Sequence, residues 1–296
     1  MIRTKEISDS EKTQKAAPLR IAIQGYRGAF HEIAARNFHQ NQEIEIVPAD
    51  TFDEVVELVE KGEQANGGMM AIENSLAGSI MHNYRLLNES NLSVFGEVFL
   101  RIKQNLMALP GRRIEDLKEV HSHPMAIAQC REFFRSYPHI RLIETLDTAL
   151  SAKRIQEQNL QQVGAIASSL AAELYELDVL MPSIETNKKN YTRFLVLGPK
   201  NGAPPIEEVE KVSLCFSAGH EVGSLHKVLA VLAAYNINLT KIQSAPIIGR
   251  QWEYRFFVDF VMEGKVGWGQ ALEAIKPLTT ELKVLGTYRK GMHYEL

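Results

Sequence analysis

Apolar residues in the first two thirds of the chain form short continuous runs, separated by longer stretches with apolar positions three or four residues apart. A short apolar run predicts a buried strand, and the wider spacing predicts an amphipathic helix. The predicted strands or extended segments cover residues 19–23, 43–47, 68–72, 92–97, 99–109, 119–121, 141–144, 163–167 and 195–197. The helices predicted between them begin near Phe30, Thr51, Ser79, Met125, Thr148 and Ser169. This alternation is typical of an α/β fold.

Small and polar residues follow most of these strands, just before the next predicted helix. In an open α/β sheet such junctions present ligands, and the helix N-termini there favour anions. The first junction contains Gly25 and Gly28, but it lacks the third glycine of a dinucleotide fingerprint, and no phosphate-binding lysine follows. Thr192 and Arg193 lie at the start of the strand predicted for residues 195–197. We therefore expect two α/β lobes whose loops face a shared cleft that binds a small anion.

The pattern changes after residues 198–205, which are rich in glycine and proline and predict a linker. The strands predicted beyond it cover residues 212–217, 239–244, 252–262 and 282–285, with helices around residues 225–232 and 271–275. That order, βαββαβ, is the ferredoxin-like unit. Such a domain leaves a sheet face or edge to cover, so pairing with a second copy is expected.

Composition narrows the class of protein. The 296 residues are 45% hydrophobic and 23% charged with a net charge of -3, which is ordinary for a globular protein and argues against a nucleic-acid binder. Cys130 and Cys215 match no disulfide framework or zinc spacing and fit a reducing cytoplasm. His121 and His123 lack a third metal ligand at a suitable spacing, so we expect no metal. No apolar run approaches the roughly 18 residues of a membrane span.

Five separate segments, taken in order, resemble prephenate dehydratase followed by an ACT regulatory domain. They are residues 25–30, 72–80 (Ile-Glu-Asn-Ser-Leu-Ala-Gly-Ser-Ile), 122–130 (Ser-His-Pro-Met-Ala-Ile-Ala-Gln-Cys), 147–149 and 192–194 (Thr-Arg-Phe). The resemblance implies a catalytic domain with two lobes, like a periplasmic binding protein, and a C-terminal ferredoxin-like ACT domain. The implied limits are a disordered leader at 1–18, a catalytic domain at 19–198 with lobes at 19–97 plus 183–197 and at 98–182, a linker at 199–211 and an ACT domain at 212–290.

The family converts prephenate to phenylpyruvate, with loss of carbon dioxide and water, in L-phenylalanine biosynthesis and without a cofactor. By this resemblance Thr192, Arg193 and Phe194 are the catalytic residues. A threonine hydroxyl is a weak acid, so Thr192 is expected to hydrogen-bond the departing hydroxyl rather than to protonate it fully. The residues expected to bind substrate are Gly28, His31, Glu73, Asn74, Ser75, Ser79, Ser122, His123 and Thr148.

Two segments depart from the family pattern. Ala29 and His31 occupy positions where the family usually carries hydroxyl residues, so His31 is either a titratable substitute in the site or a histidine on a helix surface. In the ACT domain, the residues expected to sense L-phenylalanine are Gly223, Ser224, Leu225, Ser244 and Pro246. Gln243 and Ala245 replace the glutamate and arginine of the family's segment.

The expected partners are prephenate, L-phenylalanine as allosteric effector, and other copies of the chain in a dimer or tetramer formed through the ACT domains. Arogenate dehydratase is the nearest alternative, because arogenate passes through the same chemistry. A non-catalytic amino-acid-binding sensor is a second alternative. A fused chorismate mutase is not expected, because 18 residues precede the first predicted strand.

Overall fold

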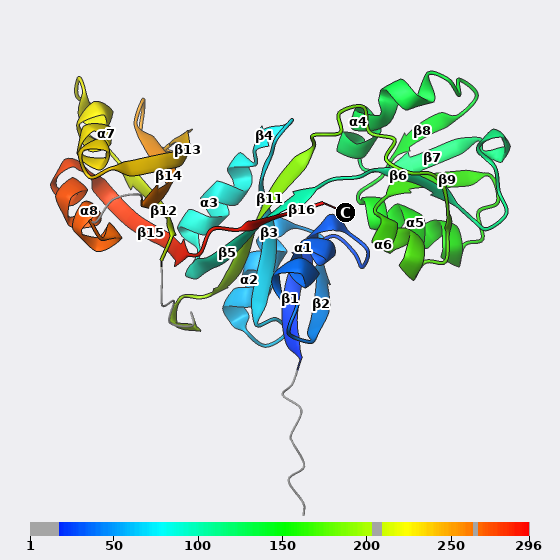
Figure 1. Cartoon of the computed structure of the whole chain (residues 1–296), viewed down its shortest axis with the longest axis horizontal. Coiled ribbons are helices and arrows are strands. Elements are labelled where there is room, and N and C mark those ends of the chain that lie inside the picture. Colours follow the sequence, from blue (N-terminus) through cyan, green and yellow to red (C-terminus); the bar gives the residue numbers. More distant parts are fainter. Residues whose placement is uncertain (1–17, 203–208, 263–265, 296) are drawn as a thin grey trace, which may run out of the picture.

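The computed structural model describes residues 18–202, 209–262 and 266–295, so the predicted leader apart from Pro18 and the middle of the predicted linker lie outside the described residues. Three α/β units follow one another along the long axis of the molecule (Figure 1). The ACT unit lies at one end, the lobe containing the N-terminal strand lies in the middle, and the second lobe lies at the other end. The predicted α/β class is confirmed.

The first lobe is a mixed sheet with strand order β5-β11-β3-β1-β2. Its strands are β1 (Leu19–Gln24), β2 (Ile44–Ala49), β3 (Gly67–Asn74), β5 (Leu92–Arg101) and β11 (Tyr191–Pro199), with a short β4 (Gly78–Ser79) paired to β3. Its helices are α1 (Phe30–Phe38), α2 (Phe52–Lys61) and α3 (Met81–Glu89). β1 is parallel to β2 and β3, whereas β11 runs antiparallel to both of its neighbours. The strand predicted for 195–197 is therefore longer, and Thr192 lies within it.

The second lobe is a five-stranded sheet with order β10-β6-β9-β7-β8. Its strands are β6 (Asn105–Ala108), β7 (Glu119–Ser122), β8 (Arg141–Glu144), β9 (Val163–Ala167) and β10 (Asp178–Met181). Its helices are the short η1 (Ile114–Asp116), α4 (Pro124–Phe134), α5 (Thr148–Glu157) and α6 (Ser169–Leu174). β10 was not predicted although Val179, Leu180 and Met181 are a short apolar run; it is an edge strand whose side chains are mostly exposed. β5 stays in the first sheet to its end, four residues past the lobe boundary expected at 97.

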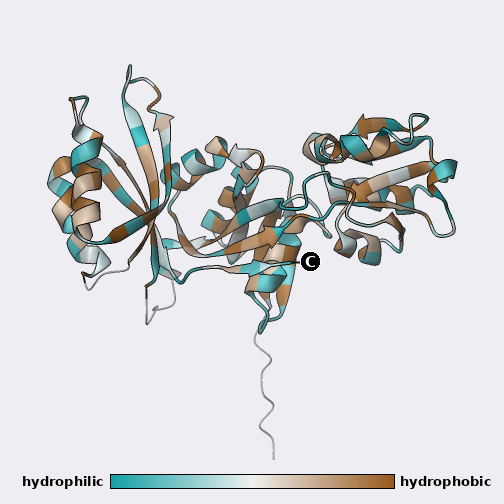
Figure 2. Ribbon diagram, turned by 45° about the horizontal axis from the view of Figure 1, so that its top comes forward, coloured by the Kyte–Doolittle hydropathy of each residue, from teal (hydrophilic) through white to brown (hydrophobic). Residues whose placement is uncertain are grey.

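The ACT unit has the predicted βαββαβ order. Its elements are β12 (Lys211–Ser217), α7 (Ser224–Ala234), β13 (Ile237–Pro246), β14 (Tyr254–Met262), α8 (Trp268–Ile275) and β15 (Thr280–Tyr288). Short helices η2 (Lys200–Gly202) and η3 (Lys276–Leu278) precede β12 and β15. The sheet order is β13-β14-β12-β15, and α7 and α8 carry alternating hydrophobic and hydrophilic bands (Figure 2). This banding is expected for helices that cover one face of a sheet.

The ACT sheet and the first-lobe sheet are joined edge to edge. β15 pairs with β5 at Gly286 and Val94, and a side chain at position 286 would bring its Cβ to 2.1 Å from the Val94 carbonyl oxygen. A last strand, β16 (Met292–Tyr294), then runs parallel to β5 from Val98 to Leu100, back toward the catalytic lobes (Figure 1). β16 was not predicted, because three residues carry no periodicity and this strand exists only through its partner.

The two lobes share one hydrophobic core at the α1 end of the sheet. It combines first-lobe residues such as Ile33 and Met69 with second-lobe residues such as Ala149 and Ala171. Gly28 lies at this contact with φ +89°, and a Cβ there would lie 2.8 Å from the Ala171 Cα. Only glycine fits, because both the backbone conformation and the space exclude a side chain. The contact fixes how the lobes meet around the cleft.

Candidate active site

A cleft of about 410 Å³ opens between the two lobes. Side chains of β3, β11 and the start of α1 line it on the first-lobe side, and the starts of α4 and α5 line it on the other. The predicted residues among the lining are His31, Asn74, His123, Thr148, Thr192 and Phe194. Five of the six come from four of the predicted segments, and His31 directly follows the remaining one, so the fold brings together the loops that the sequence pattern selected.

Asn74 and Thr192 form the centre of the first-lobe wall. Asn74 Oδ1 accepts hydrogen bonds from the backbone N–H groups of Leu76 and Ala77, each at 3.0 Å, which sets the orientation of its amide. Its Nδ2 therefore faces β11 and donates to Thr192 Oγ1 at 3.0 Å. Because that oxygen is an acceptor here, and the described residues give its proton no acceptor, the Thr192 hydroxyl is free to donate toward the cleft.

Further amide side chains extend this wall across to the second lobe. Asn74 Nδ2 also donates to Asn190 Oδ1 at 2.8 Å, Asn190 Nδ2 donates to Gln129 Oε1 at 3.0 Å, and Gln104 Nε2 donates to the same oxygen at 3.3 Å. Gln104 and Gln129 line the cleft, and Asn190 is fully buried. None of the three was predicted from the sequence. Gln129 lies inside the segment 122–130, and a glutamine among the otherwise apolar residues at the start of α4, 124–130, was a usable signal.

His31 belongs to the cleft and not to a helix surface. Its ring packs edge-on against Phe194, with centroids 4.9 Å apart, and lies 5.6 Å from the ring of Phe52. Nε2 is buried and has no hydrogen-bond partner in the described part of the chain. Burial lowers the pKa of His31 to about 3, so the imidazole stays neutral at physiological pH. The expectation of a titratable group therefore needs correction, because the ring presents an uncharged nitrogen instead.

The second-lobe wall consists of two capped helix N-termini. His123 caps α4, and its Nδ1 accepts from the Met125 N–H at 3.2 Å, so the proton of the neutral ring lies on Nε2. Asp147 caps α5 through Oδ1, which accepts from the Leu150 N–H at 2.8 Å. Burial raises the pKa of the Asp147 carboxyl, and backbone N–H groups oppose that rise. Thr148 begins the helix beside it.

Three predicted substrate residues have structural partners away from the cleft. Ser122 is fully buried and donates to the Ile166 carbonyl at 2.6 Å within the second-lobe sheet. Ser75 accepts from the Tyr191 N–H at 2.9 Å, which ties its loop to the start of β11. Gly28 lies at the lobe contact described above. These three residues shape the cleft without lining it.

Arg193, Glu73 and Ser79 lie on the opposite face of the first-lobe sheet. The Arg193 guanidinium binds Glu97, Asp259 and Tyr288. Glu73 and Ser79 both bind Lys241 of β13. The expectation that these three residues meet the substrate is therefore wrong for this geometry. Arg193 and Glu73 are each next in sequence to a cleft residue, and successive residues of a strand point to opposite faces. Ser79 is paired with Glu73 and bonds the same lysine.

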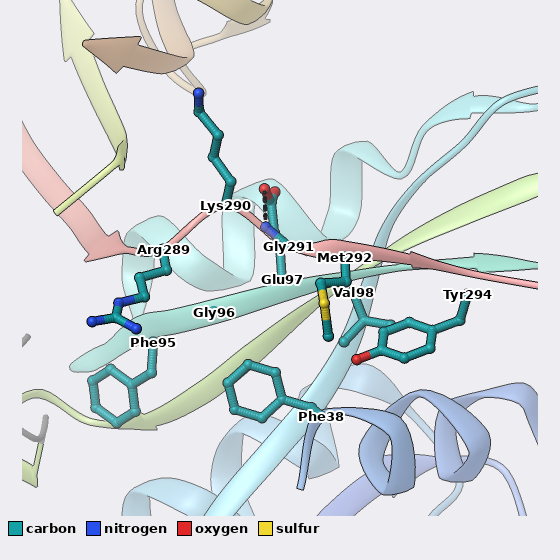
Figure 3. A pocket seen from close by; sticks show the side chains of 10 residues that line it. All are labelled: Phe38, Phe95, Gly96, Glu97, Val98, Arg289, Lys290, Gly291, Met292 and Tyr294. Carbon is teal, nitrogen blue, oxygen red and sulfur yellow. Dashed lines mark hydrogen bonds between the residues drawn. The ribbon is translucent and has the colours of Figure 1, made fainter. Parts of the chain in front are cut away.

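A second cavity, of about 470 Å³, lies on the outer side of β5 under the β15–β16 connection (Figure 3). The rings of Phe38 and Phe95 and the Met292 side chain lie on one side of β5, and the Glu97 carboxylate reaches toward Gly291 (Figure 3). None of the predicted catalytic or substrate residues lines it. The cleft between the lobes is therefore the better candidate for the active site.

The described residues hold no group of three His, Cys, Asp or Glu side chains that could bind a metal ion. Within the same ranges, no helix has the length and apolar character needed to cross a membrane.

The prephenate dehydratase family model matches residues 21–202, more than half of the chain, and an ACT domain model matches residues 215–267. The chain belongs to the prephenate dehydratase family. The family, the fold and the lyase class predicted from the sequence are thus confirmed.

Curated relatives cover nearly the whole chain. Arogenate dehydratase 2 of Petunia hybrida is 40% identical over 295 residues, which cover 94% of this chain and 74% of that protein. A chloroplastic arogenate dehydratase/prephenate dehydratase 2 of Arabidopsis thaliana is 38% identical over 291 residues, 94% of this chain and 75% of that protein.

Solved structures share the fold over most of the chain. A prephenate dehydratase from Arthrobacter aurescens, determined in complex with L-Phe, superposes with a TM-score of 0.81 at 24% identity and covers 92% of this chain and 90% of its own. A protein described as GqqA, a novel type of quorum quenching acylase, also gives a TM-score of 0.81, at 30% identity. That superposition covers 92% of this chain and 98% of the other.

Proposed function

We propose that the cleft between the lobes carries out the dehydration and decarboxylation of prephenate, with Thr192 as the group that stabilises the departing hydroxyl. The observation that supports this most is the Asn74–Thr192 hydrogen bond, because it makes the threonine oxygen an acceptor and leaves its proton for the substrate. A hydrogen bond donated to a leaving hydroxide is stronger in the transition state than in the ground state, and so accelerates the reaction. The developing aromatic ring supplies the driving force.

The two substrate carboxylates need donors, and the described lining contains no lysine or arginine. The first N–H groups of a helix lack intrahelical partners and favour anions. α1 begins at Phe30 beside the cleft, and its N-cap residue Ala29 has no capping side chain, which leaves this end open to a ligand. We assign one carboxylate to the α1 end with His31 beside it, and the other to Nε2–H of His123 and the hydroxyl of Thr148.

The test is phenylpyruvate formation by the purified full chain, with prephenate and arogenate supplied separately at equal concentrations. Appearance of an aromatic product from either substrate supports the proposed chemistry. A folded protein inert toward both would refute it and favour the amino-acid-binding sensor.

Arogenate remains the second candidate, and Asp147 favours it. Asp147 is a carboxylate at the cleft wall, where it attracts the ammonium group that arogenate carries and prephenate lacks, whereas it repels the carboxylates of both substrates alike. Asp147→Asn keeps an oxygen that can cap α5 and removes the charge. We expect it to raise the ratio of kcat/KM for prephenate to that for arogenate about five- to tenfold, a charge effect of about 1 kcal/mol. An unchanged ratio would exclude Asp147 from substrate choice.

The cleft does not have the arrangement that a threonine nucleophile of acyl transfer requires. A threonine nucleophile needs a base within hydrogen-bond reach. In the described residues the partner of Thr192 Oγ1 is Asn74, while His123 Nδ1 accepts from a backbone N–H and His31 Nε2 has no partner. The geometry favours a hydrogen-bond donor over a nucleophile.

We also propose that the ACT unit binds L-phenylalanine through Gly223, Ser224, Leu225, Ser244 and Pro246. Gly223 precedes α7 with φ +79°, and Ser244 and Pro246 lie on the edge strand β13. The Arthrobacter structure, which carries L-Phe by its description, supports this assignment. In titration calorimetry, millimolar L-phenylalanine is expected to give a saturable heat of binding. D-phenylalanine is expected to give none. Equal heats would contradict a specific site.

The remaining assignments follow from these. We propose a homo-oligomer, dimer or tetramer, formed through the ACT domains, because β13 is a sheet edge with exposed positions.

We propose a cytoplasmic location because both cysteines are buried free thiols, although the Arabidopsis relative is described as chloroplastic. We propose the domain limits 19–198, 199–211 and 212–290, since β11 ends at Pro199 and β12 begins at Lys211.

A further inference from the structure

The strand pair that carries Thr192 and Asn74 also carries two charged residues on its opposite face. The register of β11 and β3 sets Thr192 opposite Asn74 and Arg193 opposite Glu73. Directly opposed residues of an antiparallel pair share one face of the sheet, whereas successive residues lie on opposite faces. The cleft pair and the charged pair are therefore adjacent in sequence and separated by the thickness of one sheet.

The Arg193 guanidinium is held by a buried and charge-balanced group. Nε donates to Glu97 Oε2 at 2.7 Å, Nη2 donates to the Tyr288 hydroxyl at 3.1 Å, and Nη1 pairs with Asp259. Lys211 Nζ lies 2.8 Å from Glu97 Oε2. The exposed fractions are 6% for Arg193, 2% for Glu97 and 5% for Asp259 and Lys211, so water competes little for these bonds. Asp259, Tyr288 and Lys211 belong to the ACT strands β14, β15 and β12.

Glu73 forms a salt bridge with the ACT strand β13. Lys241 Nζ lies 2.5 Å from Glu73 Oε1 and donates to Ser79 Oγ at 2.6 Å. Ser79 Oγ in turn donates to Gln243 Oε1 at 3.0 Å. Both strands of the β11–β3 pair are thus bonded to the ACT unit directly behind the cleft.

The chain after the ACT unit adds a contact to the same group. The Gly291 N–H donates to Glu97 Oε1 at 3.2 Å (Figure 3). A Cβ at position 291 would lie 2.3 Å from the Glu97 carbonyl oxygen, so this close approach needs glycine. β16 then pairs with β5, the strand next to β11.

We infer that Arg193 and Glu73 are positioning residues, through which the ACT strands fix the Thr192 hydroxyl and the Asn74 amide in the cleft. The inference rests on the dehydration proposed above. A fork-shaped guanidinium with three acceptors holds its backbone more firmly than one point charge does. A misplacement of about 1 Å at a reacting group can cost about 100-fold in rate.

The same contacts give β13 a short route to the cleft. Lys241 and Gln243 lie on the strand that also carries Ser244 and Pro246. If an effector displaces β13, the Lys241 side chain moves with it and shifts its partner Glu73. Asn74 is the next residue along β3.

The test uses Lys241→Met, because Arg193 is buried among charges and its replacement endangers folding. Lys283→Met is the matched control. Lys283 of β15 donates to the carbonyls of Asn88 at 2.6 Å and Ser90 at 2.8 Å, so it also joins the ACT unit to the first lobe but contacts neither β3 nor β11. We expect Lys241→Met to lower kcat about tenfold with KM within about twofold, Lys241→Arg to restore most of kcat, and Lys283→Met to leave it within about twofold.

Hydrogen–deuterium exchange supplies a second measurement that needs no activity. Peptides covering residues 70–80 and 188–197 are expected to exchange faster in Lys241→Met than in the wild type or Lys283→Met. Equal effects of the two methionine variants on kcat and on exchange overturn the inference. If the wild type turns over neither prephenate nor arogenate, the proposed function fails instead, and the exchange comparison still decides whether Lys241 holds the two strands.

Discussion

Replacing Thr192 by alanine is expected to lower kcat for the aromatising reaction about 100- to 1000-fold, the usual cost of removing one preorganised donor from a developing negative charge. KM is expected to change by less than about threefold, because the hydroxyl contributes mainly in the transition state. The measurement is phenylpyruvate formation under saturating prephenate, with a thermal melt to show that the variant is folded.

Two further substitutions separate the hydroxyl from the shape of the side chain. Thr192→Ser keeps the donor and the oxygen that accepts from Asn74, so it should retain at least about a tenth of the wild-type kcat. Thr192→Val keeps the shape and loses the donor, so it should resemble alanine. A valine variant within a few-fold of the wild type would show that the leaving hydroxide does not depend on this group.

The sequence predicted the strand-to-helix loops correctly but not the face on which each loop residue lies. Thr192, Arg193 and Phe194 are consecutive, and as a motif they were expected to act together. In the structure Thr192 and Phe194 line the cleft and Arg193 binds the ACT unit. The strand was predicted only for 195–197, so its alternation was not applied to Thr192 and Arg193, where it would have separated them.

Residues that act through long-range partners were also beyond sequence reasoning. The partners of Glu73 and Ser79 lie more than 160 residues further along the chain, in another domain. Gln104 and Asn190 enter the cleft wall only because the chain crosses between the lobes there. β16 pairs with β5, almost 200 residues earlier in the chain, and Tyr294 bonds Asn37 at the end of α1. Local periodicity contains no information on such pairings, whereas it does predict the helices, most of the buried strands and the βαββαβ order. The break expected at residue 98 was wrong, because β5 continues to Arg101 and β6 begins at Asn105.

A second large effect is expected in the pH dependence of stability, and it comes from His31. Its pKa is about 3 in the folded protein, because burial disfavours the charged ring, against 6.5 when unfolded. Below pH 6.5 the imidazole therefore binds a proton in the unfolded chain but not in the folded chain. The stabilisation of the folded state by the neutral ring is fully present above pH 6.5, and it is lost as the pH falls toward 3.

His31→Gln removes this titration and retains a polar group at the cleft. Between pH 6.5 and pH 4 the free energy of unfolding of the wild type is expected to fall by about 3 kcal/mol more than that of the variant. Urea unfolding at half-unit pH steps measures the difference. His39, whose pKa is also lowered by burial, is present in both proteins, so it cancels from the comparison. If the free energies of unfolding of the two proteins fall in parallel with pH, the His31 ring binds a proton as readily in the folded chain as in water. The cleft wall around it would then be open to water rather than closed by Phe52 and Phe194.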